Sequence, residues 1–341
     1  MASTLNLEAN TAPFSILLVC HAGASLGLGH LARMLAVGSA LVRFGAVDVH
    51  LLIQGDELER DDLAGFGHSF VDMAADLGDA VIGACDDIRP SVVVFDLHPK
   101  LLPVNFASHA DLLRERSIRI VGVDSLLALC ESIDVTWVPS LLVTDAAAAS
   151  CSAPIYSGWD SFLIKRPRKA REWSPGRRVL VLTGGGDVTG QNATLPGLID
   201  TALPAEAEVW WVRGPFAERP VLPNEPRREW TVHEAPSGLD ELMDQSDYAI
   251  TVFGVTLFEL LQRGIPTVVF SPYDDREFPD LDLVAAAGVA VVTENAEAAA
   301  EAAALLMRDH SRARVLSATA LERMAENGAD RLANLIHSLG E

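Results

Sequence analysis

The chain has 341 residues, a hydrophobic fraction of 49% and a net charge of −21. Its length predicts two domains, and its acidity argues against nucleic acid or anionic membranes as partners over most of the surface. The four cysteines are widely spaced, which indicates reduced thiols and not a disulfide framework or a metal site. Residues 1–13 resemble a disordered tail and lack the basic segment of a signal peptide, so we expect a cytoplasmic protein without membrane insertion.

The first half of the chain alternates short apolar runs with helical patterns. A strand predicted at 15–20 leads into a glycine-rich loop, then into a helix that ends at Gly45 and a second strand at 47–55. Further strands are predicted at 90–97 and 118–125. Strands that alternate with helices in this way are typical of a mostly parallel sheet.

The second half begins after a basic segment and repeats the same arrangement. Residues 166–178 combine positive charge with two prolines and predict a linker, which could be a solvated connector or could attract an anionic ligand. A strand and a glycine-rich loop follow at 178–190. The sequence therefore predicts two Rossmann-like, doubly wound α/β domains that face each other across a cleft, at 14–165 and 179–341.

The loop after the first predicted strand contains the main candidate for catalysis. Gly27 and Gly29 permit close backbone approach at the carboxyl end of a strand, where open α/β sheets bind ligands, and with Arg33 they are candidate sugar or phosphate contacts. His30 begins the following helix, where a neutral imidazole can act as a base; a capping or packing role is the alternative. We do not expect NAD, because the full dinucleotide fingerprint is absent and Gln54 ends the second strand.

Two further strand ends in the first half carry polar side chains. Asp96 and His98 follow one apolar run, and Asp124 follows the next. In a parallel sheet these positions line the cleft. Asp96 and His98 are therefore predicted catalytic partners of His30, and Asp124 is predicted to contact sugar or phosphate. Structural capping is the alternative for all three.

Two segments of the second half are predicted to bind a nucleotide. Three glycines after an apolar strand expose N–H groups that can hold a phosphate, although a tight turn would explain them as well. Later, a strand ends beside a helix start whose amides can face a diphosphate, and a carboxylate one turn into that helix can accept two ribose hydroxyls. The predicted nucleotide-binding residues are Gly184, Gly185, Gly186, Phe253, Gly254, Val255, Thr256 and Glu259.

Together these motifs resemble a known family. The segment Gly27-Leu-Gly29-His30-Leu-Ala-Arg33 is similar to the Gly-x-Gly-His-x-x-Arg signature of UDP-sugar hydrolases of the pseudaminic-acid pathway, the PseG/SpsG group, which is related to the MurG glycosyltransferases. The resemblance implies the GT-B fold, a UDP-linked sugar bound mainly by the second domain, and His30 activating water at the anomeric carbon without a cofactor or a metal. It continues at 123–125, 156–163, 181–187 and 253–266, and loosely spans 16–292.

The chain departs from that family pattern in two places. Phe253-Gly254-Val255-Thr256 replaces the family's two glycines and Ser/Thr, and residues 273–277 replace an Ala/Glu-Asn-Gln element near the sugar. Asp274 and Asp275 in this second segment are predicted to face a hydroxyl-rich or amino sugar. The expected activity is hydrolysis of a nucleotide-sugar. Glycosyl transfer at the same site, or nucleotide-sugar binding without catalysis, are the alternatives.

Overall fold

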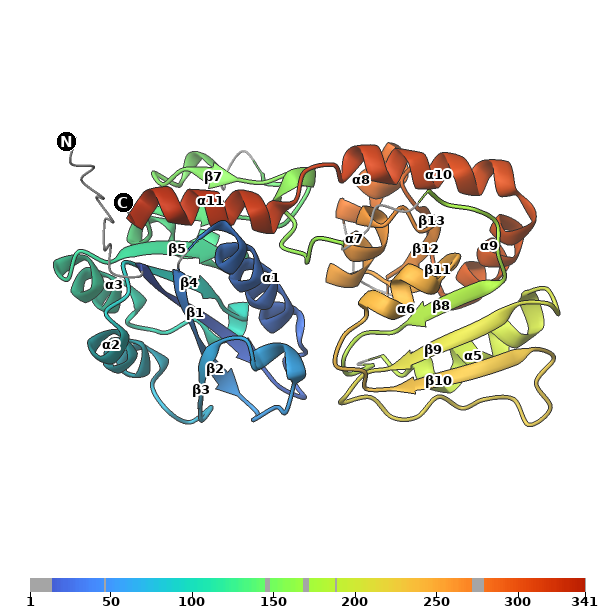
Figure 1. Ribbon diagram of the computed structural model, residues 1–341, viewed down its shortest axis with the longest axis horizontal. Helices are drawn as coiled ribbons and strands as arrows, with labels where there is room; N and C mark the ends of the chain where they lie inside the picture. Colours follow the sequence, from blue (N-terminus) through green and yellow to red (C-terminus); the bar gives the residue numbers. More distant parts are fainter. Residues whose placement is uncertain are drawn as a thin grey trace, which may run out of the picture.

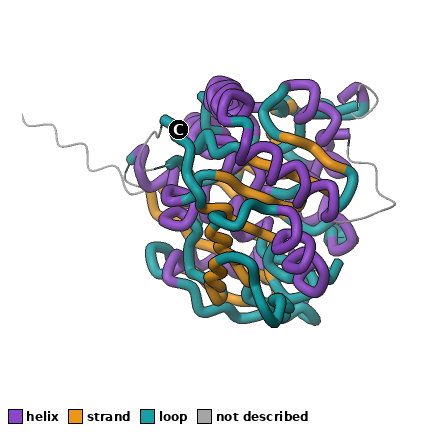
Figure 2. Tube along the Cα trace, turned by 90° about the vertical axis from the view of Figure 1, so that its right-hand side faces the viewer, coloured by secondary structure: helices purple, strands orange, loops and turns teal. Residues whose placement is uncertain are grey.

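The computed structural model describes residues 14–45, 47–144, 148–167, 172–187, 189–271 and 279–340. These residues form two α/β halves that lie side by side (Figure 1). In the view toward the second half, helices flank the strands on both sides (Figure 2). The predicted tail 1–13 and the two acids Asp274 and Asp275 lie outside the described residues.

The first half contains a parallel sheet in the strand order β3-β2-β1-β4-β5-β6-β7. Its central strands are apolar runs without alternation because helices cover both faces. The strands are β1 (Phe14–Ala22), β2 (Val47–Gly55), β3 (Gly67–Val71), β4 (Val92–Asp96), β5 (Arg119–Val123), β6 (Val135–Trp137) and β7 (Ile155–Tyr156), and the helices are α1 (Gly29–Phe44), α2 (Leu77–Ile88) and α3 (Phe106–Glu115).

The second half contains a parallel sheet in the order β10-β9-β8-β11-β12-β13. Helices α5 and α9 pack on one face, while α6 and α7 pack on the other. The strands are β8 (Arg178–Leu182), β9 (Glu208–Arg213), β10 (Glu229–Glu234), β11 (Tyr248–Val252), β12 (Thr267–Phe270) and β13 (Val291–Thr293), and the helices are α5 (Gln191–Ala202), α6 (Asp240–Gln245), α7 (Val255–Gln262), α8 (Pro279–Ala287), α9 (Ala296–Arg308) and α10 (His310–Arg323).

The last helix returns to the first half. Helix α11 (Gly328–Gly340) lies along α1 on the first half, whereas α10 lies on the second half (Figure 1). Leu332, Ala333 and Ile336 are buried in the same core cluster as strands β1 and β4. The sequence assigned 179–341 to the second domain, but the packing shows that its last helix belongs to the first. No helix among the described residues is long and apolar enough to cross a membrane.

Each sheet has one point where the strand order reverses. In the first half it lies between β1 and β4, and in the second between β8 and β11. Because neighbouring crossovers leave in opposite directions there, the carboxyl ends of the two strands open a crevice in which doubly wound folds bind ligands. The two Rossmann-like, doubly wound domains expected from the sequence are thus confirmed, and each presents such a crevice.

Candidate active site

The crevice of the first half brings His30 against Asp96. His30 is the second residue of α1, and Asp96 is the last residue of β4. Nδ1 of His30 lies 2.8 Å from Oδ1 of Asp96. A terminal nitrogen of Arg33 lies 2.9 Å from the same Nδ1 and 2.6 Å from Oδ1 of Asp96. Because the carboxylate only accepts hydrogen bonds and the guanidinium can donate to that carboxylate, we assign the proton of the ring to Nδ1. Nε2 is then the unprotonated nitrogen, so the ring is in the tautomer that a general base requires.

Arg33 holds the Asp96 carboxylate in place. Its Nε donates to Oδ2 of Asp96 at 2.7 Å, and one terminal nitrogen donates to Oδ1 at 2.6 Å. The other terminal nitrogen lies 2.9 Å from Oδ2 of Asp124. The guanidinium therefore faces two protein carboxylates, and neither Arg33 nor Asp124 lines the cavity described below. This geometry does not support the expectation that these two residues contact phosphate or sugar.

The charges of this cluster stabilise one another. Asp96 is fully buried. Burial raises the pKa of its carboxyl, but the charge of Arg33 and then that of His30 outweigh burial, and the net pKa lies below its usual value. Burial lowers the pKa of Arg33, yet Asp96 and Asp124 raise it further, so the guanidinium stays charged. Asp96 is therefore an anion at neutral pH and orients the imidazole of His30.

A second imidazole lies beside His30. The ring centroids of His30 and His98 are 6.1 Å apart, with an interplanar angle of 74°. The backbone N–H of His98 donates to Nδ1 of His21 at 2.9 Å, and Nε2 of His21 lies 3.1 Å from Oε1 of Gln54. Burial, followed by the charge of His30, lowers the pKa of His98. The three predicted catalytic side chains therefore meet at one strand-end crevice.

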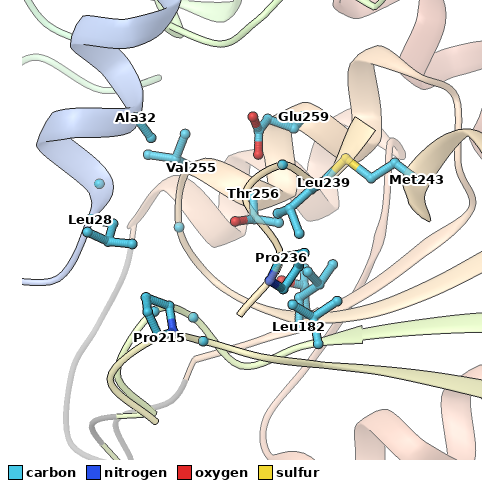
Figure 3. Close-up of a pocket in the computed structure, with 18 of the residues that line it drawn as sticks. Leu28, Ala32, Leu182, Pro215, Pro236, Leu239, Met243, Val255, Thr256 and Glu259 are labelled. Atoms are coloured by element: carbon cyan, nitrogen blue, oxygen red, sulfur yellow. The ribbon is translucent and has the colours of Figure 1, made fainter. Parts of the chain in front are cut away.

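Between the two halves lies a cavity of about 280 Å³. Leu28, the residue before α1, and Ala32 of α1 face Val255 and Glu259 of α7 across it (Figure 3). An ideal Cβ on Gly29 would lie 4.0 Å from the side chain of Val255, so the two halves approach closely at this edge. The predicted site residues that line the cavity are Gly29, Gly184, Gly185, Phe253, Gly254, Val255, Thr256 and Glu259, whereas Gly27, Gly186, His30, Asp96 and His98 are not among its lining residues.

The loop glycines of the second half are packed at close range. A Cβ on Gly214 would come within 2.4 Å of the carbonyl oxygen of Gly185 and 2.5 Å of that of Gly184. Only a glycine fits there without displacing the loop. Gly184 itself has a φ of 91°, a conformation that favours glycine. These contacts fix the backbone that forms the floor of the cavity.

The two helix starts at this crevice differ in what caps them. The carboxylate of Asp187 accepts from the backbone N–H groups of Gln191 and Asn192, both at 2.8 Å, at the start of α5. No side chain caps the start of α7, which begins after Gly254 in the cavity wall. A helix N-terminus carries partial positive charge and favours an anion. The α7 end is therefore the better position for a phosphate.

Glu259 supplies a carboxylate to the same wall. It lies one turn into α7 and is half-buried (Figure 3). Burial raises the pKa of its carboxyl, the charge of Arg263 opposes this, and the net pKa lies above its usual value. A partly desolvated carboxylate that faces a cavity is suited to accept hydrogen bonds from ligand hydroxyls.

Comparisons with solved structures agree with this architecture. The spinosyn rhamnosyltransferase SpnG complexed with thymidine diphosphate is 16% identical, with a TM-score of 0.61, 94% of this chain covered and 100% of that one. For Phytolacca americana UGT2 complexed with UDP-2fluoro-glucose and pterostilbene the values are 13%, 0.64, 97% and 100%. For Acinetobacter baumannii MurG they are 14%, 0.59, 96% and 100%. The chain has the GT-B fold of glycosyltransferases.

The comparisons with solved structures show the GT-B fold and nothing more specific. No family model matches the sequence, and no curated protein matches it either. Nothing in these comparisons bears specifically on the PseG/SpsG group, on pseudaminic acid or on hydrolysis. At identities of 13–16% the likeness to these structures shows the fold alone.

The sequence did not indicate three charged residues of the cavity wall. Arg60 and Asp62 follow β2, and Lys165 lies just before the predicted linker; all three line the cavity from the side of the first half. Arg60 and Asp62 come after the carboxyl end of a predicted strand, and this position was the only feature of the sequence that pointed to them. Charged residues are common in surface loops, so the position alone does not identify them as site residues.

One group of side chains has the composition of a metal site. Asp76, Asp79 and His109 bring ligand atoms within 4.8 Å of one another. Both acids are exposed, and Asp76 already caps α2 by accepting from the backbone N–H of Asp79 at 3.1 Å. None of the three lines the cavity. This group is therefore separate from the candidate active site.

Proposed function

We propose that this protein transfers a glycosyl group from a nucleotide-sugar to a hydroxyl acceptor, with His30 as the general base. The observation that carries the proposal is the hydrogen bond between His30 and the buried, ionised Asp96 at the crevice of the first half. His30 directly follows Gly29, which lines the cavity shared with the second half. A base at the edge of a ligand-sized cavity on the GT-B fold suits chemistry at the sugar end of a nucleotide-sugar.

In this proposal the second half binds the nucleotide. The diphosphate lies at the uncapped start of α7 and against the backbone of Gly184 and Gly185. Glu259 accepts hydrogen bonds from the ribose hydroxyls. The sugar then extends past Gly29 toward His30. This order runs from the α7 wall, where Thr256 and Glu259 lie, toward Leu28 and Ala32 on the side of the first half (Figure 3).

With the proton on Nδ1, His30 has an unprotonated Nε2 that can act as the general base of the transfer. Nε2 takes the proton of the acceptor hydroxyl as its oxygen bonds to the anomeric carbon. The bond between that carbon and the diphosphate breaks, and the nucleoside diphosphate leaves with the bonding electrons. Asp96 stabilises the imidazolium that forms, and the amides at the start of α7 stabilise the charge on the leaving group. No step requires a cofactor.

Hydrolysis uses the same residues with water as the acceptor. It is the reaction that the sequence resemblance implied, whereas the solved structures with the same fold favour transfer. The test is a panel of UDP-, TDP- and GDP-sugars, scored for binding and for release of the nucleoside diphosphate with and without a mixture of hydroxyl acceptors.

We expect release that depends on an acceptor and produces a glycosylated product. Equal release of free sugar without any acceptor would instead establish hydrolysis. Binding without release under either condition would identify a nucleotide-sugar binding protein, and absence of binding across the panel would refute the proposal.

Replacing Glu259 with glutamine is expected to stabilise the ligand-free protein and weaken nucleotide binding. The raised pKa means that the folded state binds this proton more tightly than the unfolded state, so stability falls as pH rises through the window above the unfolded value of about 4.5. Glutamine removes that penalty. At pH 7 the gain in unfolding free energy should exceed the ~0.5 kcal/mol scatter of surface substitutions.

Urea unfolding at several pH values measures this effect, and calorimetry measures nucleotide affinity. Glu241→Gln on α6 is the matched control, because Glu241 is exposed and does not line the cavity. A loss of stability in Glu259→Gln, or unchanged affinity for the nucleotide, would contradict the role assigned to this carboxylate.

A further inference from the structure

In the cavity wall that belongs to the first half, two cationic side chains pair with the same carboxylate. Nε and a terminal nitrogen of Arg60 donate to Oδ1 and Oδ2 of Asp62 at 2.9 and 2.7 Å. Nζ of Lys165 donates to Oδ2 of the same carboxylate at 3.4 Å. All three side chains line the cavity. The trio therefore has a net charge of +1 in a chain whose net charge is −21.

Asp62 holds this trio in its ionised form. Burial raises the pKa of its carboxyl, but the hydrogen bond and charge of Arg60, followed by the charge of Lys165, outweigh burial and lower the net pKa. The exposed fractions of the side chains are 21% for Arg60, 17% for Asp62 and 30% for Lys165. The two cations are thus partly desolvated and positioned, and one carboxylate does not neutralise them both.

The other charged side chains of the cavity leave this trio as its main cationic feature. Arg213 also lines the cavity, but it pairs at 2.9 Å with Glu234, which is not a lining residue. Asp240 pairs with Arg263. The charge of Lys165 acts on the carboxyl of Glu259, on the opposite wall, where it opposes the larger effect of burial, which raises the pKa. Arg60 and Lys165 line the same cavity as Thr256 and Glu259 of α7.

We propose that Arg60 and Lys165, positioned by Asp62, bind the diphosphate of the nucleotide from the first half, opposite the start of α7. The inference rests on the proposed function and adds the residues of the first half that bind the nucleotide-sugar donor. Two charge-assisted donors facing a helix N-terminus clamp a diphosphate between the two walls. Bound nucleotide would then tie the two halves together, since Lys165 lies at the end of the first half and α7 belongs to the second.

The test compares Lys165→Met with Arg166→Met. Arg166 is the next residue, but it pairs with Asp330 at 3.1 Å, is 66% exposed and does not line the cavity. Calorimetry measures the affinity of each variant for a nucleoside, its monophosphate and its diphosphate, using the base that the wild-type protein prefers. Arg60→Gln is a second variant that tests the trio independently of Lys165.

We expect Lys165→Met and Arg60→Gln each to weaken binding of the diphosphate about tenfold, or about 1.4 kcal/mol. The monophosphate should lose less, the nucleoside nothing, and Arg166→Met should leave all three affinities unchanged. The diphosphate loss should shrink at high salt. An equal loss for the nucleoside, or no loss for the diphosphate, would overturn the clamp while wild-type binding still supports the proposed function. If the wild-type protein binds none of the three ligands, both proposals fail.

Discussion

Replacing His30 with alanine is expected to lower turnover of the nucleotide-sugar by about 10²–10⁴-fold, the contribution usual for a positioned general base. Affinity for the nucleoside diphosphate should change little, because His30 is not among the residues that line the cavity. The protein should still fold, since Asp96 keeps both of its hydrogen bonds from Arg33. Steady-state kinetics should therefore show a fall in kcat with a nearly constant dissociation constant for the product.

His68→Ala is the matched control for that experiment. His68 is exposed on β3, where its side chain contacts the backbone oxygen of Phe66 and the ring of Phe70. It should retain wild-type turnover. If His30→Ala also retained turnover close to that of the wild-type protein, His30 would not be the base, whatever the nucleotide site binds.

Replacing Arg33 with methionine is expected to destabilise the protein by about 3–5 kcal/mol, because it leaves the buried Asp96 without its principal counter-charge. Methionine keeps most of the aliphatic volume of arginine, so the loss reports on charge more than on packing. Arg43→Met on the same helix is the control. Arg43 pairs with Asp330 but its side chain is 46% exposed, and exposed pairs contribute about 0–1 kcal/mol.

The pH dependence of the Arg33→Met effect has a definite sign. In the wild-type protein Asp96 has a lowered pKa, so its contribution to stability is present above the unfolded value of 3.8 and is lost as pH falls through the folded pKa. Without Arg33, burial raises the pKa and the contribution reverses. The stability gap measured by urea unfolding should be widest near pH 7 and should narrow in acid. A gap that is constant with pH would show that Asp96 is not its source.

The sequence alone predicted the parts of this site that lie at strand ends. The apolar run before Gly27 and the helical pattern after His30 placed that histidine at the carboxyl edge of a sheet. The run before Asp96 placed the carboxylate at the same edge, and β1 and β4 are indeed neighbours, with Cys20 aligned to Asp96. Strand ends in a parallel sheet converge regardless of the side chains involved, so periodicity is sufficient to find them.

The hydrophobic pattern of the sequence does not predict contacts between segments that are far apart in the chain and follow no shared strand order. Arg33 is three residues from His30 and was expected to face a ligand, but its guanidinium reaches Asp96 and Asp124 instead. Lys165 belongs to no strand end, and only the approach of the two halves places it in the cavity wall. Helix α11 is amphipathic, and the sequence does not say which core its apolar face joins. Tertiary packing decides all three.

The distinction between transfer and hydrolysis depends on the acceptor and not on the fold. Both reactions need the same base, the same leaving group and the same nucleotide site, so the residues around His30 and Glu259 suit either one. The acids Asp274 and Asp275, predicted to face the sugar, lie outside the described residues and stay a prediction. The sugar itself is therefore a question for the donor panel.

The most direct test of the central claim is a crystal structure of the protein with the nucleoside diphosphate that binds best. The account predicts the ribose on Glu259, the diphosphate between the start of α7 and the pair Arg60 and Lys165, and the terminal phosphate directed toward His30. A nucleotide bound outside the cavity, or one whose diphosphate points away from His30, would contradict it.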